Sequence, residues 1–362
     1  DALRNANGQN RQWDGIWNAI VVRSDVGWTL EVEIPFRTLN FDPNTDTWGI
    51  NFQRTVRRKN EESVWTGWLR NQGLFRLTNA GRLVGLSDVS QGHGLDVKPY
   101  LLGLVESFPG RGKPGFQDGH DAGVDVFYSP VPSVRANLTV NTDFAQTEVD
   151  QRLVNLTRFP QFFPEKRDFF LDGSTFFDFQ SAAGGGNSLL PFFSRRIGLD
   201  SNGNPQKIDA GAKFAGQFGR TDVGALYVRT GRDDQAGVDG EAFAVLRAKR
   251  RILRQSYVGA LVTNRDGRPG AAASRTLGAD VSLTTSTFLG ARNLTVGGFF
   301  VSTTTAPGVG QGKAFGVQVD YPNDPWTASV LVREIQKHYD AEVGFTPRTG
   351  VRRMNGALLR TI

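Results

Sequence analysis

Two tryptophans in the N-terminal quarter of the chain could bind a carbohydrate. Trp65 and Trp68 lie three positions apart, shortly after Arg54 and Glu62. An exposed indole offers a flat apolar face on which a sugar ring can stack, and charged side chains can hydrogen-bond to sugar hydroxyls. These four residues therefore form a candidate sugar site. The alternative is that both indoles are core residues, because tryptophan is usually largely buried in soluble domains.

A second charged group lies within a phenylalanine-rich stretch. Glu165, Lys166, Arg167 and Asp168 are consecutive in the sequence. Two carboxyl groups hydrolyse a glycosidic bond only when they face each other across a cleft at a defined separation. Sequence neighbours rarely meet that condition, so we expect ion pairs that fix the stretch and no catalytic residue here.

Other catalytic and metal chemistry lacks the residues that it needs. The chain has no cysteine and three histidines, and the zinc-protease, nucleophile-elbow and phosphate-loop motifs are absent. We expect no metal and no cofactor. The net charge is +6, from 42 basic and 36 acidic residues with both signs interspersed, which gives no reason to expect a nucleic-acid partner.

The composition favours β structure. The 362 residues include 43 glycines and 26 phenylalanines but only one methionine, a combination that suits strands, tight turns and aromatic packing. No stretch approaches 18 consecutive apolar residues, so no transmembrane helix is expected. A membrane-spanning barrel stays open, because alternating strands average out in hydropathy.

Residues 1–88 are predicted to be part of an antiparallel β-sandwich. Six of the seven tryptophans lie here. The segments Trp28–Phe36 and Trp48–Arg54 alternate apolar and polar residues with period two, and a turn-forming run at residues 42–46 separates them. This alternation predicts half-buried strands with one face toward a core.

Residues 89–362 have a different pattern, with strand-like segments separated by Gly, Asn, Asp and Pro. The predicted strands are Leu95–Val105, Asp121–Tyr128, Val134–Asn141, Ile208–Phe218, Thr221–Arg229, Glu241–Arg250, Gln255–Asn264, Arg275–Thr284, Asn293–Thr303, Lys313–Tyr321 and Trp326–Arg333. Within one of them, Val317 and Val319 alternate with Gly316 and Gln318. Bulky apolar residues on one face and small or polar ones on the other are typical of an outer-membrane barrel. A soluble sandwich with one wet face would show the same alternation.

An insert at about residues 143–186 fits neither the helical nor the strand period. It holds nine phenylalanines, among them Phe162, Phe163, Phe169 and Phe170, interspersed with prolines and charged residues. So many aromatic side chains are too apolar for a solvated linker. We predict a structured, non-strand insert that packs against the wall or the mouth of a barrel.

The insert also carries a resemblance. The sequence NTDFAQTEVDQRLVNLTRFPQFFPEKRDFFLDGSTFF, at residues 141–177, resembles the hallmark segment of an uncharacterised family of Gram-negative outer-membrane β-barrel proteins. In that family the barrel follows a domain similar to the family 9 carbohydrate-binding modules. WTLEVEIPFRTLNF at residues 28–41 and WGINFQRTVRRKNEESVWTGW at residues 48–68 resemble the C-terminal half of such a module. The resemblance implies this architecture and an outer-membrane location, and it supplies no reaction.

Three functional hypotheses follow. In the first, the chain belongs to an outer-membrane barrel that captures or passes glycans or related ligands, with membrane lipid and a glycan as partners. In the second, it belongs to a glycan-degrading hydrolase whose sandwich is the accessory binding module. In the third, it is a structural or interaction barrel without sugar binding. The chain is expected to be an internal fragment of a longer protein, and its oligomeric state stays open.

Overall fold

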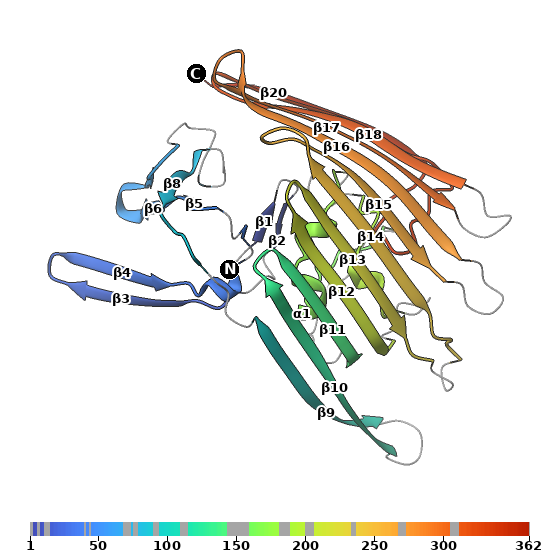
Figure 1. Cartoon of the computed structure of the whole chain (residues 1–362). Helices are drawn as coiled ribbons and strands as arrows, with labels where there is room; N and C mark the ends of the chain where they lie inside the picture. Colours follow the sequence, from blue (N-terminus) through green and yellow to red (C-terminus); the bar gives the residue numbers. More distant parts are fainter. Residues whose placement is uncertain are drawn as a thin grey trace.

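The computed structural model describes residues 3–5, 8–10, 15–39, 41–42, 45–67, 74, 79–89, 94–108, 115–142, 159–180, 189–199, 206–232, 237–266, 273–304 and 311–361. The described residues are nearly all β structure with a few short helical turns (Figure 1), which confirms the predicted all-β fold class. No described helix has the length and apolar character needed to cross a membrane.

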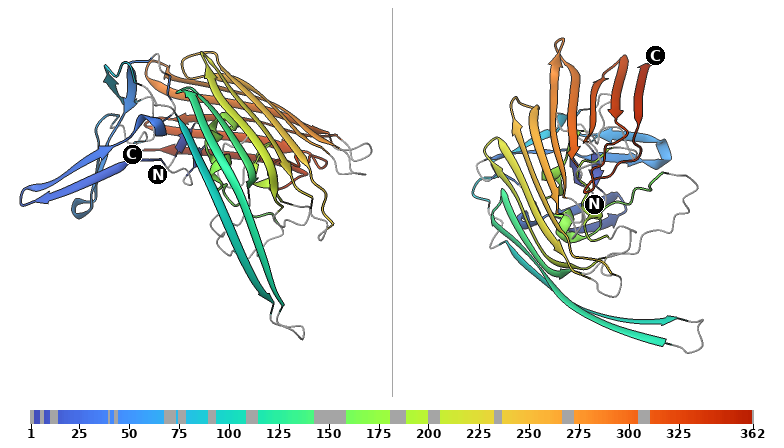
Figure 2. Two further views of the ribbon diagram at one scale, coloured as in Figure 1. Left: turned by 60° about the horizontal axis from the view of Figure 1, so that its bottom comes forward. Right: turned by 90° about the vertical axis from the view of Figure 1, so that its right-hand side faces the viewer.

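One antiparallel sheet of twelve strands dominates the structure. Its strands are β9 (Leu95–Phe108), β10 (Gly115–Val131), β11 (Val134–Thr142), β12 (Ile208–Phe218), β13 (Thr221–Thr230), β14 (Ala242–Arg251), β15 (Tyr257–Arg265), β16 (Ser274–Phe288), β17 (Arg292–Thr304), β18 (Gln311–Pro322), β19 (Trp326–Ile335) and β20 (Val351–Arg360). Each strand pairs with the next one along the chain, so β9 and β20 are the two edges, and the described sheet is open rather than closed into a barrel. The sheet is strongly curved (Figure 2).

The sequence predicted eleven of these strands and missed β20. The bounds of β12 agree with the prediction at both ends, and the other ten predicted strands overlap β9–β11 and β13–β19. β20 has the sequence VRRMNGALLR. Its arginines and central glycine hide the alternation, and only its pairing with β19 along ten residues reveals it as a strand.

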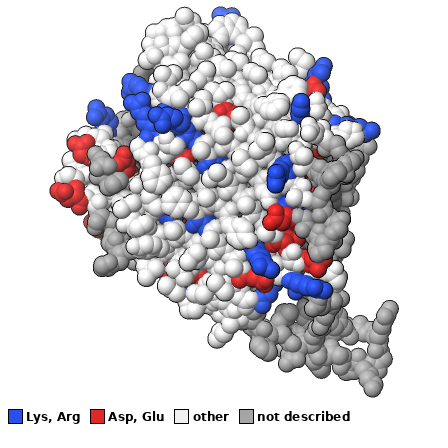
Figure 3. All heavy atoms as spheres, turned by 45° about the vertical axis from the view of Figure 1, so that its right-hand side comes forward, with Lys and Arg blue, Asp and Glu red and all other residues white. Residues whose placement is uncertain are grey.

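On several strands of the large sheet, polar side chains are buried and large apolar side chains are exposed, which is the reverse of the usual pattern in a water-soluble protein. On β16, Ser274, Thr276 and Ser282 are buried, whereas Leu277 and Leu283, which each directly follow one of them, are exposed. The buried residues face the concave side, which on β13 and β14 also holds buried apolar residues such as Val228 and Phe243, and the convex side exposes large apolar side chains. Seen from outside, the middle of this convex face carries few charges, and Lys, Arg, Asp and Glu gather toward its rims (Figure 3).

The concave side is occupied by the predicted insert, which we call the plug and define as described residues 159–180 and 189–199. It contains α1 (Asp168–Leu171) and two 3-10 turns, η5 (Ser174–Phe177) and η7 (Ser194–Arg196), and it lies inside the curve of the sheet (Figure 2). The rest of the predicted insert, residues 143–158 and 181–186, lies outside the described residues.

In residues 1–88 the described part forms four separate two-stranded sheets. They pair β1 (Leu3–Asn5) with β2 (Gly8–Asn10), β3 (Asn18–Ser24) with β4 (Gly27–Glu33), β5 (Thr47–Ile50) with β8 (Gly81–Val84), and β6 (Gln53–Val56) with β7 (Glu61–Val64). Two short turns, η1 (Phe36–Thr38) and η2 (Arg57–Lys59), complete this part. The β3–β4 hairpin projects away from the large sheet (Figure 1).

Two local expectations for residues 1–88 were wrong. β4 is exposed along both faces instead of half-buried, because no described sheet lies face to face with the β3–β4 hairpin. The predicted strand Trp48–Arg54 is divided into β5 and β6 at Asn51. The side-chain oxygen of Asn51 accepts hydrogen bonds from the backbone N–H groups of Phe52 (2.9 Å) and Thr66 (3.1 Å), so it substitutes for ladder bonds at this point.

Candidate functional site

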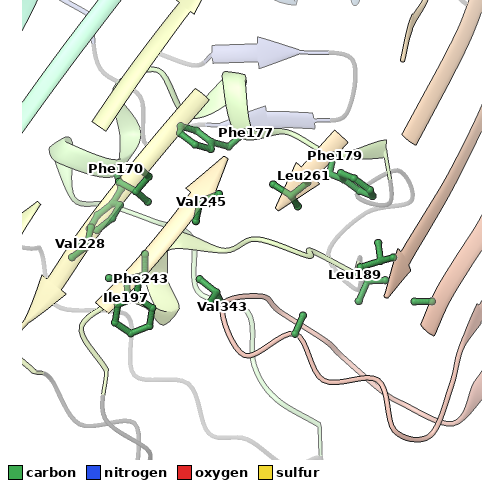
Figure 4. Packing of buried hydrophobic residues seen from close by; sticks show 14 of the residues in the cluster. Phe170, Phe177, Phe179, Leu189, Ile197, Val228, Phe243, Val245, Leu261 and Val343 are labelled. Carbon is green, nitrogen blue, oxygen red and sulfur yellow. The ribbon is translucent and has the colours of Figure 1, made fainter. Parts of the chain in front are cut away.

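The plug is anchored to the sheet by aromatic side chains (Figure 4). Phe169 is 1% exposed, and Phe170, Phe177 and Phe179 are also buried. They belong to one apolar cluster with residues of β12–β15, β17, β18 and β19 on the concave face of the large sheet, which we call the wall. Burying one phenylalanine contributes roughly 1.5–3 kcal/mol, so these rings can offset much of the entropy lost on ordering a segment without regular structure.

Two of these rings lie directly over wall glycines. A Cβ atom at Gly224 on β13 would lie 3.0 Å from the ring of Phe177, and one at Gly278 on β16 would lie 3.0 Å from the ring of Phe179. Such a contact is tighter than ordinary van der Waals packing. The glycines therefore act as sockets on the concave face, and any side chain there would push the plug away from the wall.

The first part of the plug contacts a loop rather than the wall. Phe162 is 39% exposed, and its ring lies 5.1 Å from that of Phe193 and 5.3 Å from that of Phe345. Leu190 and Phe345 exchange backbone hydrogen bonds of 2.9 and 2.8 Å. Phe163 is half-buried beneath Arg195. Residues of both described parts of the plug are therefore bound to the connection between β19 and β20.

The predicted charged group Glu165–Asp168 makes contacts that hold the plug together. Arg167 donates to both carboxylate oxygens of Glu165 at 2.8 and 2.7 Å, donates to the carbonyls of Ser194 and Ile197, and lies over the Phe170 ring. Burial raises the pKa of Glu165, but the charge and hydrogen bonds of Arg167 outweigh it, and the pKa is below its usual value. Glu165 is thus held ionised.

The other members of that group face elsewhere. Asp168 pairs with Lys98 on β9 at 2.7 Å, and both side chains are largely exposed. The backbone N–H of Lys166 donates to Glu165 at 3.0 Å. The two carboxylates therefore do not form a facing pair across a cleft, which is the arrangement that glycoside hydrolysis requires.

A polar cluster on β11 and β12 holds the end of α1. Asp172 forms an ion pair with Arg135 and accepts a hydrogen bond of 2.8 Å from Asn137, while Lys213 donates to the backbone carbonyls of Phe169 and Asp172. Burial raises the pKa of Asp172, but the charges of Lys213 and Arg135 outweigh it and hold the pKa below its usual value. Wall and plug are thus joined by opposite charges as well as by rings.

A second cluster, on β14 and β16, is completely buried. Arg247 donates to both oxygens of Asp280 at 2.7 and 2.8 Å, and both side chains are 0% exposed. Arg247 also donates to the carbonyl of Asp178, and Asp280 accepts from the backbone N–H of Gln180, each at 3.0 Å. We call these four residues the latch, because two wall residues hold the plug backbone on either side of Phe179.

The side-chain carboxyl group of Asp178 has a raised pKa. Burial raises its pKa to about 7, against the smaller opposing effect of the Lys249 and Arg247 charges. Its Oδ2 atom has no hydrogen-bond partner among the described groups. A buried carboxyl group in this situation favours its neutral form.

The candidate sugar site is only partly assembled. Trp65 is 58% exposed and tilted against Phe52, with ring centroids 5.8 Å apart. Arg54 on β6 lies two residues after Phe52, which directly precedes this strand, and over the ring of Trp28 at 5.7 Å. Glu62 pairs with Thr55 in the β6–β7 register and therefore points to the opposite face.

Trp68 lies outside the described residues. The structure thus brings together Trp65, Phe52, Arg54 and Trp28, and it separates Glu62 from them. Sequence reasoning missed Phe52 and Trp28 as possible contributors. The alternation of Phe52 with Arg54 in the predicted strand Trp48–Arg54 was the available signal for the first.

The latch and the Asp172 cluster were also missed as units. The alternation of Arg247 and Lys249 with alanines on β14 was visible in the sequence, but nothing local indicates which segment those charges meet.

Comparison with known protein families finds a match to part of the chain. Residues 93–233 match the family described as Domain of unknown function (DUF5916). The matched span runs from the first strand of the large sheet through the plug to β13. No curated protein matches the chain. The similarity therefore supports an uncharacterised domain in the region where the plug meets the sheet.

Proposed function

We propose that this chain is part of an outer-membrane β-barrel protein, plugged by residues 159–180 and 189–199, that captures or passes glycans or related ligands. The observation that carries the proposal is the outward face of the large sheet, which exposes large apolar side chains, whereas the inward face combines polar residues with the apolar patch that packs the plug.

The outward face supports contact with lipid. Val262 pairs with Leu277, Phe300 with Phe315 and Val317 with Val332, and all six side chains are exposed. Soluble monomers rarely expose apolar patches larger than a few hundred Å². An outward apolar band over a polar interior is instead the pattern of a transmembrane barrel.

The connections between strands also support this proposal. At one end of the sheet the turns are short, at residues 132–133, 219–220, 252–256, 289–291 and 323–325. At the other end the connections are longer, including residues 231–241 and 336–350 and the whole plug segment between β11 and β12. Outer-membrane barrels have short periplasmic turns and longer extracellular loops.

Aromatic residues flank the short turns. Phe218, Phe288, Tyr321 and Trp326 lie at the strand ends beside residues 219–220, 289–291 and 323–325, and Phe288 and Tyr321 are in edge contact at 6.3 Å. Aromatic girdles mark membrane interfaces in such barrels. Because β9 begins at this same end, the arrangement favours a periplasmic position for residues 1–88.

The membrane part of the proposal is tested by fractionation of cells that express the protein. We expect recovery in the outer membrane and a folded form that migrates differently on an electrophoresis gel before and after boiling. Recovery as a soluble periplasmic monomer without detergent would overturn it.

The glycan part depends on the exposed Trp65, and it is tested on the detergent-solubilised chain with a glycan array. Trp65→Ala should lose binding because it removes the stacking surface, and Arg54→Ala should weaken binding because it removes a charge-assisted hydrogen bond. The matched control is Thr55→Ala, which lies on the opposite face of the same strand. Equal binding by all three variants and the parent would refute a sugar site here and favour the interaction barrel.

A further inference from the structure

Three arginines lie among the aromatic residues at the short-turn end of the large sheet. Arg250 is the next-to-last residue of β14, Arg292 is the first residue of β17, and Arg360 is the last residue of β20. All three are exposed. Together with the four aromatic residues at the same strand ends they form a group that we call the belt. The belt consists of Phe218, Arg250, Phe288, Arg292, Tyr321, Trp326 and Arg360.

On the last strand pair, an arginine of the belt is held against a tryptophan. Arg360 on β20 and Trp326 on β19 are register partners, so their side chains share a face of the sheet. The guanidinium group of Arg360 lies over the Trp326 ring at 5.5 Å. Trp326 is 42% exposed and is in phase with Val330, which is exposed on the outward face. The pair therefore presents a positive charge and an indole ring outward.

The neighbouring strands repeat this arrangement. Arg292 on β17 donates a hydrogen bond of 2.5 Å to the hydroxyl group of Tyr321 on β18. Its register partner on β16 is Phe288, whose ring is in edge contact with that of Tyr321. Arg250 on β14 donates to the hydroxyl group of Thr221 on β13 at 3.3 Å. These contacts orient the arginines, and none of them neutralises an arginine's charge.

The acidic residues of the described strands β12–β20 lie elsewhere. They are Asp209, Asp222, Asp280, Asp320 and Glu334. Asp222, Asp280 and Asp320 are in phase with buried residues of their strands, so they point to the concave face. Asp209 and Glu334 lie at the end of the sheet with the long connections. Within these strands, the outward face at the short-turn end therefore carries basic residues without acidic ones.

The short turns beside the belt combine positive charge with exposed apolar side chains. In turns 219–220, 252–256, 289–291 and 323–325 the charged residues are Arg220, Arg254 and Asp324, which add one net positive charge. Leu253 is 66% exposed and Leu289 is 75% exposed. Positive charge next to exposed apolar groups suits a membrane interface, where the apolar groups enter the acyl boundary and the cations meet anionic headgroups.

We propose that the belt binds the phosphate groups of anionic phospholipids in the membrane leaflet on the short-turn side. Guanidinium groups bind phosphate oxygens in a bidentate fashion, and the rings of Tyr321 and Trp326 lie beside them at the level of the headgroups. The inference rests on the proposed function, because it requires the outward face of the large sheet to lie in a membrane. It adds the charge and the chemical group of the lipid that the protein selects.

The test uses the full chain reconstituted in phospholipid vesicles, with the fluorescence of Trp326 as the signal. Lipids with brominated acyl chains quench an indole that they touch. The other six tryptophans lie in residues 1–88, so Trp326→Phe supplies the background to be subtracted. Quenching by brominated phosphatidylglycerol and by brominated phosphatidylcholine in mixed vesicles gives the relative affinity of the two lipids at the belt. We expect phosphatidylglycerol to be preferred by about fivefold or more, the effect of one arginine near an anionic lipid.

Charge-removing variants connect the preference to the belt. Arg360→Gln and Arg292→Gln should each reduce the preference for phosphatidylglycerol several-fold, and the double variant should abolish it, because each change removes a positive charge beside the lipid phosphate. Both residues are exposed, so the folded sheet should tolerate either change. Arg275→Gln is the matched control, since it removes an outward arginine near the opposite end of β16. It should leave the preference at Trp326 unchanged.

The outcomes separate this inference from the barrel proposal. Equal quenching of Trp326 by the two brominated lipids would overturn the inference and leave the barrel proposal intact. An equal loss of preference in Arg275→Gln and in the belt variants would also overturn it, because the attraction would then come from the overall charge. Absence of quenching by either lipid would place the short-turn end outside the membrane and overturn both.

Discussion

The latch offers the sharpest test of how the plug is held. Asp280→Ala removes both carboxylate acceptors of Arg247 and the acceptor of the Gln180 N–H. Because Arg247 is fully buried, the variant leaves a positive charge without its counterion inside the structure. Breaking a buried pair in this way typically costs about 3–5 kcal/mol. We expect a marked fall in the temperature at which the folded form converts on gels, and faster proteolysis within the plug.

A double variant separates charge from packing. Arg247→Met combined with Asp280→Ala removes the unpaired charge and leaves mainly two lost hydrogen bonds to the plug backbone, at roughly 1 kcal/mol each. The double variant should therefore be more stable than Asp280→Ala alone. The matched control is Arg275→Gln on the exposed face of β16, where the change should stay within about 0.5 kcal/mol. If Asp280→Ala melts like the parent, or the double variant is the least stable of the three, the reasoning is refuted.

Two further perturbations test the plug. Phe169→Ala should cost about 3–5 kcal/mol because the ring is fully buried, whereas Phe162→Ala should cost clearly less because its ring is 39% exposed; equal melting of both variants and the parent would show that the plug is not packed. Burial raises the pKa of Asp178 to about 7 in the folded state. The folded protein therefore keeps a proton on Asp178 that the unfolded chain loses above about pH 4. The stability that this protonated form contributes is present in acid and is lost as the pH rises through about 7. Asp178→Asn should flatten the fall in melting temperature between pH 5 and pH 8, by an amount worth at most about 3 kcal/mol, and an unchanged pH profile would contradict a buried Asp178.

The sequence by itself determined the strands of the large sheet to a considerable extent. Alternation with period two is a local property, because successive side chains of a strand point to opposite faces. It predicted Ile208–Phe218 with both ends in place, and it sorted Val317 and Val319 onto the face opposite Gly316 and Gln318. The composition of the insert likewise indicated a packed, non-strand segment, since its phenylalanines are too many for a solvated linker.

Only the tertiary structure decided which groups meet. Phe179 and Gly278 lie about a hundred positions apart, and no local pattern joins an aromatic ring to its socket. The register between paired strands decided which other side chains share a face. It placed Glu62 on the face opposite Arg54, although the two residues are close in sequence. It also placed Arg333 opposite Arg353, which lies on a strand that the sequence did not reveal. Periodicity fixes a face within one strand, whereas pairing between strands fixes which side chains share a site.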